Sequence, residues 1–420
     1  MADFAGFEPL NAKTLPQRLG QLPALLDTAG GPAENWQVRE VGDGNLNLVF
    51  IVEGSAGTVI VKQALPYVRL VGDSWPLPLK RSFFEHKALT RQEERDPGSV
   101  PRILHFDGEQ AIIVMEFLTP HVILRRAFID GRQMPRASRD LGLFLARTLF
   151  RGSDLAMPPR ERKEELAVFA DNVELCDITE NLVFSDPYFD AKLNRHTSPE
   201  LDGIVAQLRA DRDVKVEAQV MKHLFANKNE TLLHGDLHTG SVMVTETETR
   251  VIDPEFAFYG PMAFDVGVLL SNFWMSYFSQ SGHGERGAMQ AYLLNGVDEI
   301  WTTFRAEFSR LWRGERNGIL YQRTLFEDQG DHLGSEQALS RVLAEIWTDA
   351  LGFAGCEMHR RILGLAHNAD FETIDDSAVR ARCETKALKL GRQLLVGRRH
   401  IHSVSEVNDL AEQLEKEIVR

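Results

Sequence analysis

Residues 233–241 read LHGDLHTGS, and residues 253–255 read DPE. The first stretch surrounds Asp236 with glycine and histidine, which predicts a loop leaving a short strand, where a carboxylate can point into a cleft. Two short apolar runs flank the polar residues 245–249, which predicts a hairpin that ends at DPE. The sequence therefore predicts two acidic loops that follow one another closely along the chain.

The two carboxylates of DPE are separated by one proline. In an extended segment, side chains at i and i+2 lie on the same side of the chain, so Asp253 and Glu255 can both bind one hard cation. Asp236 is then left for another role. A carboxylate beside a Mg²⁺ site can orient a substrate hydroxyl and accept its proton.

The chain before residue 118 has the pattern of a small mixed lobe. Short runs rich in Val and Ile, separated by glycine-containing turns, predict strands, and one segment has helical spacing of its apolar residues. The expected strands lie at 36–41, 46–53, 58–63, 102–106 and 111–117, and the expected helix lies at 80–95. These elements predict a five-stranded antiparallel sheet with one inserted helix.

Three features of this lobe are typical of a phosphate site when they occur together. The turn GDGN at residues 42–45 can turn backbone N–H groups toward a phosphate, although a Gly-Asp-Gly turn alone is more often an ordinary hairpin. Lys62 ends an apolar strand, and alone it is more often a solvated strand end. Glu85, on the helix that follows, can pair with Lys62 and hold it over the phosphates.

After residue 118 the sequence changes to long amphipathic segments with helical periodicity. Examples lie at 139–150, 201–209 and 217–225. We therefore expect an N-terminal lobe at residues 1–118, a hinge at about 116–120 and a C-terminal lobe at 119–420.

The features occur in one order: glycine turn, strand lysine, helical glutamate, sheet, HGD and DxE. In this order the chain resembles the protein-kinase-like phosphotransferases, which include the aminoglycoside and choline kinases. Within them it is most similar to the methylthioribose kinases, over essentially the whole chain. The similarity is carried by LHGDLHTGS, by DPE, by GDGNLNLVF at residues 42–50, by GDSWP at 72–76 and by the pair Arg360 and Arg361. It implies an α+β, bilobal protein-kinase-like fold with a small five-stranded N-lobe and a large, mainly helical C-lobe.

The resemblance also implies a role for each site residue. The residues implied to bind ATP in the N-terminal lobe and beside the metal are Gly44, Asn45, Lys62, Glu85, Glu116, Phe117, Leu118, Asp253, Pro254 and Glu255. The residues implied to bind the sugar are Asp236, Arg360, Arg361 and Trp75, with Asp236 as the catalytic base and Asp253 and Glu255 as Mg²⁺ ligands. The implied reaction is transfer from ATP to the anomeric hydroxyl of 5-methylthioribose, in methionine salvage. That hydroxyl is more acidic than an ordinary alcohol, so a carboxylate of ordinary pKa suffices as proton acceptor.

Two other functions stay open at this point. One is a phosphotransferase of the same fold that acts on choline or an aminoglycoside, and the other is a catalytically dead module that only binds ATP. Cationic acceptors favour an acidic pocket. Activity on the sugar that depends on Arg360 or Arg361 would therefore argue against the choline or aminoglycoside alternative. Turnover of ATP that requires magnesium would exclude the second.

Several of these residues also have a purely structural interpretation. His234 and His238 have the spacing of a metal pair on a helix, but the adjacent glycines favour a loop that the two histidines hold by hydrogen bonds. Asp265 is charged inside an apolar run, so we expect it to be buried and to hold the HGD backbone.

The arginine pair and the tryptophan also have both a functional and a purely structural interpretation. Neighbours on a helix point about 100° apart, so we expect at most one of Arg360 and Arg361 to face a pocket, and both could be surface charge. Trp75 lies in a loop flanked by proline, and it could cover the sugar as a lid or pack over the lobe edge.

Charge and hydropathy exclude several partner classes. The chain has 47 Lys and Arg against 61 Asp and Glu, and its net charge of −14 argues against broad binding to nucleic acid or anionic lipid. No run approaches the roughly 18 apolar residues of a spanning helix, and the N-terminus has no signal-peptide pattern. We therefore expect a cytoplasmic protein with small-molecule substrates, and relatives imply a homodimer.

Overall fold

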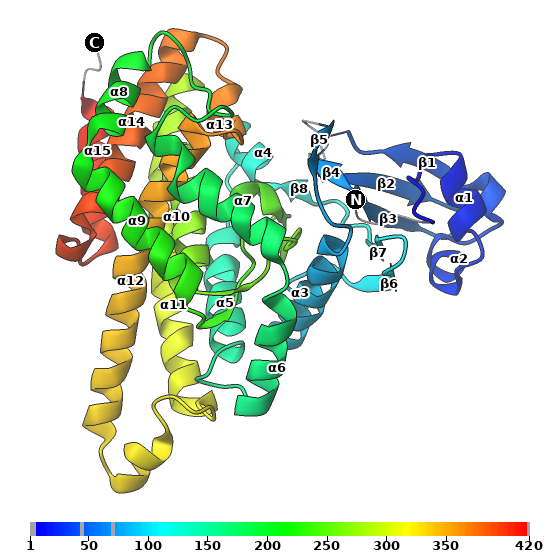
Figure 1. Cartoon of the computed structure of the whole chain (residues 1–420), viewed down its shortest axis with the longest axis horizontal. Helices are drawn as coiled ribbons and strands as arrows, with labels where there is room; N and C mark the ends of the chain where they lie inside the picture. The colour runs from blue at the N-terminus through cyan, green and yellow to red at the C-terminus, as the bar shows by residue number, and fades with distance from the viewer. Residues whose placement is uncertain (1–5, 43–45, 69–71, 418–420) are drawn as a thin grey trace. The chain divides into compact units, whose positions relative to one another are not determined.

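The computed structural model describes residues 6–42, 46–68 and 72–417. The chain folds into two compact units (Figure 1). The first unit contains Met1–His121 together with Asn172–Leu175 and Arg250–Ala257. The second unit contains Val122–Asp171, Cys176–Thr249 and Phe258–Arg420. The segment DPE therefore belongs to the first unit, although it follows the HGD loop in the sequence.

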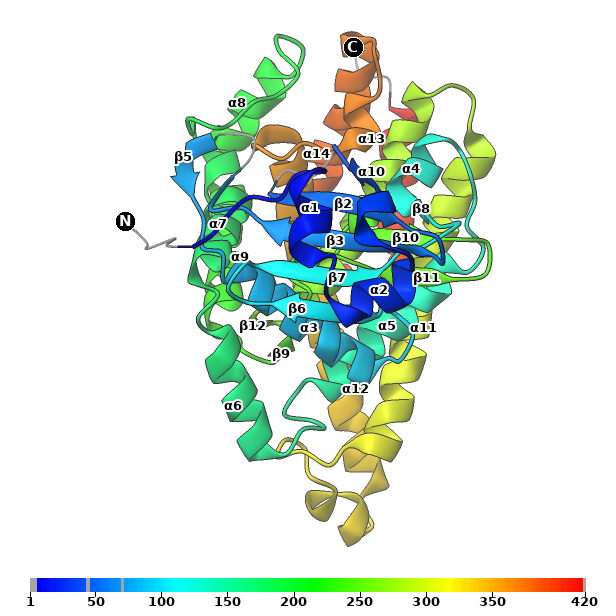
Figure 2. The ribbon, with the colours of Figure 1, turned by 90° about the vertical axis from the view of Figure 1, so that its right-hand side faces the viewer.

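The first unit is built on a five-stranded antiparallel sheet of strand order β1-β2-β3-β7-β6 (Figure 2). Its elements are β1 (Gln37–Glu40), β2 (Asn47–Glu53), β3 (Thr58–Ala64), α3 (Arg81–Arg95), β6 (Ile103–Asp107) and β7 (Ile112–Glu116). The predicted sheet and its inserted helix are confirmed, and each predicted end lies within one residue of the observed end.

The residues of β3 alternate between the core on one face of the sheet and the opposite face, on which Lys62 lies. Val59 and Val61 are fully buried in a core that also contains Leu15 of α1 (Thr14–Leu19) and Leu25 of α2 (Pro23–Ala29). Both views show α1 and α2 over one face of the sheet, and neither helix was predicted (Figures 1 and 2). Because successive strand residues point to opposite faces, Lys62 lies on the other face, where α3 packs.

The segment of Trp75 is a short strand. β5 (Gly72–Pro76) pairs with β4 (Tyr67–Val68), and Tyr67 lies opposite Pro76. The expected loop is therefore wrong. A two-stranded ribbon needs few backbone hydrogen bonds, and proline is tolerated at the end of an edge strand, so the flanking prolines do not exclude a strand here.

The second unit is mainly helical, as expected. Its helices are α4 (Leu124–Ile129), α5 (Ala137–Arg151), α6 (Pro159–Phe169), α8 (Asp202–Ala210), α9 (Arg212–Asn227), α10 (Met262–Ser279), α11 (Gly287–Glu315), α12 (His332–Leu363), α13 (Ala369–Glu372), α14 (Ser377–Gly397) and α15 (Val404–Lys416). α7 (Val173–Phe184) begins in the first unit and continues in the second. Further short strands among the described residues are β8 (Val122–Ile123), β9 (Thr231–Leu232), β10 (Val242–Val244), β11 (Thr249–Val251) and β12 (Tyr259–Gly260).

Helix α10 is the centre of the second unit. Every one of its residues is buried, and it packs against α11, α12 and α14 (Figure 1). An apolar helix enclosed on all sides by other helices needs no polar face. Within the described part of the chain, no helix combines the length and the apolar character that crossing a membrane requires.

Candidate active site

Lys62 is the centre of an ion-pair group in the first unit. Its Nζ lies 2.7 Å from Glu85 Oε1 and also donates a hydrogen bond to Asp253. Lys62 is 7% exposed and Glu85 is 2% exposed, so the pair is enclosed between β3 and α3. Burial lowers the pKa of Lys62, but the charges of Asp253, Glu85 and Glu255 outweigh it and raise this pKa above its usual range. Lys62 is therefore a permanent cation.

Glu255 is enclosed by donors of the same unit. Arg81 Nε lies 3.1 Å from Glu255 Oε2, and Asn47 Nδ2 lies 3.3 Å from both carboxylate oxygens. The fully buried Arg81 also donates to the carbonyls of Leu46 and Leu65, each at 2.5 Å. One guanidinium thus connects the start of β2, the chain after β3 and the DPE segment.

The backbone at Asp253 differs from the expected one. Asp253 has φ of +68°, in the left-handed region, so the prediction of an extended segment is wrong. The two carboxylates have different surroundings: the side chain of Asp253 is 45% exposed, and that of Glu255 is 4% exposed. A non-glycine residue in this region costs about 1–3 kcal/mol, and such residues cluster at functional sites.

The donors of DPE fit a divalent metal. Among the residues that the structure describes, no three His, Cys, Asp or Glu side chains gather closely enough to hold a metal ion. Mg²⁺ is usually held by one or two carboxylates, and substrate phosphates and water fill its other positions. Asp253 has an accessible carboxylate, and Glu255 lies two residues away, so the segment offers a donor set of this kind.

The other residues predicted to bind ATP are distributed over the first unit. Gly44 and Asn45 lie outside the described residues. Glu116 ends β7, where its N–H donates to the carbonyl of Arg102 at 3.0 Å and its Oε1 accepts from the N–H of Arg102 at 3.0 Å. Phe117 is half-buried and Leu118 is 9% exposed.

The last two predicted residues are Pro254, which was expected to contact ATP, and Trp75, which was expected to contact the sugar. Pro254 is buried, and its carbonyl accepts from the N–H of Ala257 at 3.2 Å. Trp75 is half-buried on β5.

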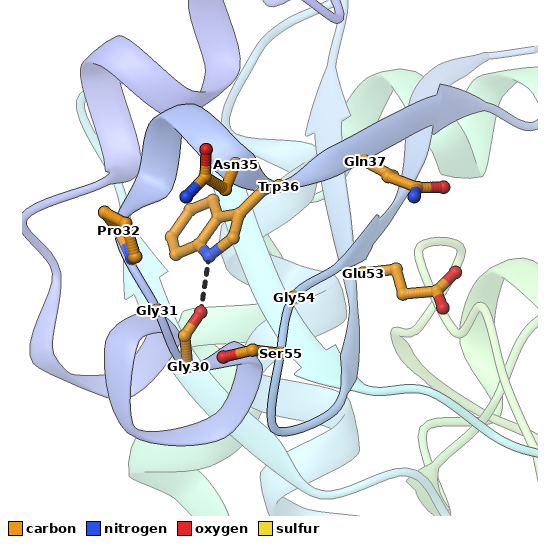
Figure 3. A pocket seen from close by; sticks show the side chains of 9 residues that line it. All are labelled: Gly30, Gly31, Pro32, Asn35, Trp36, Gln37, Glu53, Gly54 and Ser55. Atoms are coloured by element: carbon orange, nitrogen blue, oxygen red, sulfur yellow. Dashed lines mark hydrogen bonds between the residues drawn. The ribbon is translucent and has the colours of Figure 1, made fainter.

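The first unit also has a small hollow away from these residues (Figure 3). Its volume is about 250 Å³, and it lies where Gly30 and Gly31 meet Trp36 and Ser55. Trp36 Nε1 donates to the carbonyl of Gly30 at 2.9 Å, which fixes the indole at the edge of this hollow. Its lining, as far as the structure describes it, contains none of the predicted site residues.

The HGD loop of the second unit is fixed through its backbone. Asp265, at the start of α10, is 2% exposed and accepts from the N–H groups of His234 at 2.6 Å and Gly235 at 3.0 Å. Gly235 has φ of +85°, a conformation that glycine adopts without steric cost. The expectation that Asp265 holds the HGD backbone is confirmed.

Both histidines of the loop make the expected hydrogen bonds. His234 Nδ1 accepts from the N–H of Asp236 at 3.3 Å, and His238 Nδ1 accepts from the N–H of Gly240 at 3.0 Å. His238 Nε2 therefore carries the proton, and it lies 3.4 Å from Asp236 Oδ2. Burial lowers the pKa of His238 to about 4, so this imidazole is neutral at pH 7.

Both arginines of the pair contact Asp236. Arg361 Nη2 lies 2.8 Å from Asp236 Oδ1, and Arg360 Nη1 lies 3.3 Å from the same oxygen. The expectation that adjacent helical positions keep the two side chains from reaching one place is wrong, since both contact the same carboxylate. The backbone directions of the two residues differ, but each side chain is long enough to bend its guanidinium toward the same carboxylate at the end of α12. The interpretation as surface charge is also wrong, because Arg360 is 8% and Arg361 is 5% exposed.

These contacts set the charge of Asp236. Burial raises the pKa of a carboxyl group, but the charges of Arg361 and Arg360 and the hydrogen bond with His238 outweigh it. The pKa of Asp236 therefore lies well below its usual range, and the group is an anion at neutral pH. Such a carboxylate orients a donor readily and accepts a proton only from an acidic hydroxyl.

Several polar residues of these two sites were missed in the sequence. They are Asn47 and Arg81 beside Glu255, Glu357 beside Arg360 and Arg361, and Arg125, which donates to Thr239 of the HGD loop. Glu357 precedes the arginines by three and four residues on one helix, and this spacing alone could have identified it. Nothing in the local sequence marks Arg81 or Arg125, because both act on partners that lie far away along the chain.

A buried strand lysine paired with a helical glutamate, and a carboxylate in an HGD loop, are the side chains of a kinase-like phosphotransferase. The sequence family that matches the chain agrees with this class. A sequence model of the Phosphotransferase enzyme family matches residues 37–306. Among solved structures, a choline/ethanolamine kinase family protein from Mesorhizobium loti is 16% identical, with 96% of this chain and 99% of that chain covered at a TM-score of 0.38.

More similar relatives are found among curated sequences. Methylthioribose kinase 1 of Oryza sativa subsp. japonica is 42% identical over 409 residues, which cover 96% of this chain and 94% of the relative. Methylthioribose kinase of Escherichia coli O45:K1 is 43% identical over 409 residues, which cover 96% of this chain and 97% of the relative. The chain belongs to the phosphotransferase enzyme family and, within it, to the methylthioribose kinases.

Proposed function

We infer that the chain transfers the γ-phosphoryl group of ATP to the anomeric hydroxyl of 5-methylthioribose. The observation that carries this inference is the contact of two buried arginines with the HGD carboxylate. An uncharged sugar presents oxygen atoms that accept hydrogen bonds, and arginine supplies up to five donors in a fixed fork. The two guanidinium groups balance the charges of Asp236 and Glu357, so a cationic acceptor such as choline would find no net negative charge in this group. The named relatives support the same substrate.

We propose that the first unit binds ATP. Lys62 contacts the phosphates, and Glu85 keeps its ammonium group in place through their 2.7 Å ion pair. The turn that contains Gly44 and Asn45 contributes to the phosphate site, and the backbone of residues 116–118 holds adenine.

We propose that the second unit binds the acceptor and that Asp236 is the catalytic base. Its ionised oxygens orient the anomeric hydroxyl and take its proton. The low pKa of Asp236 is compatible with this role because the anomeric hydroxyl is relatively acidic and because a loose phosphoryl-transfer transition state asks little of a base. Arg360 and Arg361 donate to the sugar and stabilise the negative charge that moves with the phosphoryl group. Trp75 remains a predicted substrate contact and lid.

We propose that Asp253 and Glu255 bind Mg²⁺, with Pro254 fixing their spacing. Mg²⁺, when bound, neutralises negative charge on the phosphates of ATP. Arg81 and Asn47 hold Glu255 at a fixed place, whereas the accessible Asp253 supplies the more available oxygen.

Asp253→Asn is therefore expected to raise the Mg²⁺ concentration for half-maximal activity by about tenfold or more, because the amide loses one charged ligand. A magnesium titration at saturating ATP and acceptor measures this shift, and excess magnesium should restore part of the activity. Glu255→Gln changes the other proposed ligand, and because an amide has one acceptor oxygen where the carboxylate has two, it also weakens the contacts with Arg81 and Asn47. An unchanged magnesium titration for Asp253→Asn, with a lower melting temperature, would indicate a structural role instead.

ADP release with a panel of acceptors tests the proposed function. Methylthioribose, ribose, choline and an aminoglycoside are offered to the same enzyme with Mg²⁺ and ATP. We expect methylthioribose to give the highest kcat/KM. A preference for choline or the aminoglycoside would contradict the substrate, and no ADP release with any acceptor would indicate a module that only binds ATP. The homodimer and the cytoplasmic location stay predictions, and light scattering in solution tests the first.

A further inference from the structure

Glu357 is a buried carboxylate that the proposed mechanism has not used. It is 0% exposed, on the last turns of α12. Its Oε2 lies 3.0 Å from Arg360 Nη1, and its Oε1 lies 2.5 Å from Arg361 Nε. Arg360 Nη1 also lies 3.3 Å from Oε1, so Arg361 binds one oxygen of Glu357 and Arg360 contacts both. The i,i+3 and i,i+4 spacings bring both guanidinium groups to one side of the helix.

The same two guanidinium groups also reach Asp236. Arg360 uses Nη1 for both carboxylates, while Arg361 binds Glu357 through Nε and Asp236 through Nη2. Glu357 and Asp236 thus share one pair of cations. A planar guanidinium has fixed donor directions, so holding Arg361 Nε on Glu357 also fixes the direction of its Nη2 toward Asp236.

The charges of this group are balanced. Two carboxylates and two guanidinium groups sum to zero, and all four side chains are mostly buried. Two further groups lie near Asp236: the neutral His238, and the buried Arg125, whose charge is paired with Asp370 and which donates to Thr239 in the same loop. Removing the charge of Glu357 would leave both arginines with Asp236 as their remaining anion, and they would hold that carboxylate more tightly.

We propose that Glu357 is a positioning residue for phosphoryl transfer: it holds Arg360 and Arg361 in the orientation that the acceptor requires, and it shares their charge so that Asp236 stays available to the acceptor hydroxyl. This proposal rests on the proposed function, in which Asp236 is the base. Glu357 acts through the arginines and does not itself touch the sugar.

The first test compares two buried glutamates that each bind two arginines. Glu307 of α11 is 7% exposed, and it lies 2.8 Å from Arg147 Nε and 2.8 Å from Arg310 Nε. Glu357→Gln should lower kcat with methylthioribose by about 10- to 100-fold and leave KM for ATP within about twofold. Glu307→Gln should leave kcat within about twofold. Equal kcat values for the two variants would overturn the positioning role.

A second test separates positioning from a loss of folding. Glu357→Asp keeps the charge and should recover part of the activity that Glu357→Gln loses, at a comparable melting temperature. In an Arg361→Gln background, Glu357→Gln should cost at least about threefold less than it does in the wild type, because the two residues act together. This double variant also removes one charge of each sign, so it keeps the buried group balanced if Glu357→Gln alone does not fold.

Equal costs of Glu357→Gln in the two backgrounds, or no recovery with aspartate, would overturn the proposal. A wild-type enzyme that forms no sugar phosphate would overturn the proposed function and this inference with it. Wild-type sugar phosphorylation with a near-normal Glu357→Gln variant would overturn the positioning role alone.

Discussion

Asp236→Asn is expected to lower turnover with methylthioribose by about 10²–10⁴-fold and to leave the affinity for ATP nearly unchanged. The amide keeps the shape of the side chain but can no longer accept the hydroxyl proton as an anion. It also leaves Arg360 and Arg361 with Glu357 as their nearest carboxylate, which favours a folded site. The residues proposed for ATP belong to the other unit, so their chemistry is untouched.

Steady-state kinetics measures the turnover of the variant. The shift of its melting temperature on addition of ATP measures its affinity for ATP. Asp190→Asn is a suitable control, because it makes the same chemical change in the second unit at a side chain that is 95% exposed. We expect that control to be indistinguishable from the wild type. Turnover of Asp236→Asn within a few-fold of the wild type would remove Asp236 from the mechanism.

Arg360→Ala and Arg361→Ala are each expected to cost about 2–4 kcal/mol in transition-state binding, while KM for ATP changes little. Both arginines contact Asp236, so both variants should be impaired, unlike the single sensitive residue that the sequence predicts. Arg361→Ala should be the more severe, because its contact with Asp236 is 2.8 Å against 3.3 Å for Arg360.

The kcat/KM values of the wild type and the two alanine variants, for methylthioribose and for ATP, measure this loss of transition-state binding. Arg361→Lys should be intermediate, since an ammonium group keeps the charge but lacks the fork that binds two carboxylates at once. Arg310→Ala removes a 56% exposed arginine from Glu307 and is the matched control. Near-wild-type kcat/KM for methylthioribose in both alanine variants would contradict the proposed acceptor site.

The strands of the sheet could be predicted closely because the residues that define each strand and each turn are neighbours in the sequence. Alternating apolar residues define each strand, and turns rich in glycine separate them, so the ends of β2 and β3 are visible in the sequence. The pairing of Lys62 with Glu85 follows from the same local pattern, since one lies on a strand and the other on the next long helix. Helices α1 and α2 were missed because they are short.

The details of the acceptor site depend on contacts that the local sequence does not contain. The left-handed backbone of Asp253 cannot be read from DPE, because aspartate is compatible with both conformations. The convergence of Arg360 and Arg361 depends on side-chain torsions and on the position of Asp236, which lies more than a hundred residues earlier. Arg81 reaches Glu255 across a similar separation.

The central claim is that the anomeric hydroxyl of methylthioribose receives the phosphoryl group, and the position of phosphate in the product tests it most directly. Wild-type enzyme is incubated with ATP, Mg²⁺ and methylthioribose, and the product is analysed by phosphorus NMR with coupling to the sugar protons. The phosphorus signal is expected to couple to the anomeric proton, in an amount equal to the ADP formed. Coupling to a proton at another ring carbon, or ADP formed together with free phosphate and no sugar phosphate, would contradict the claim.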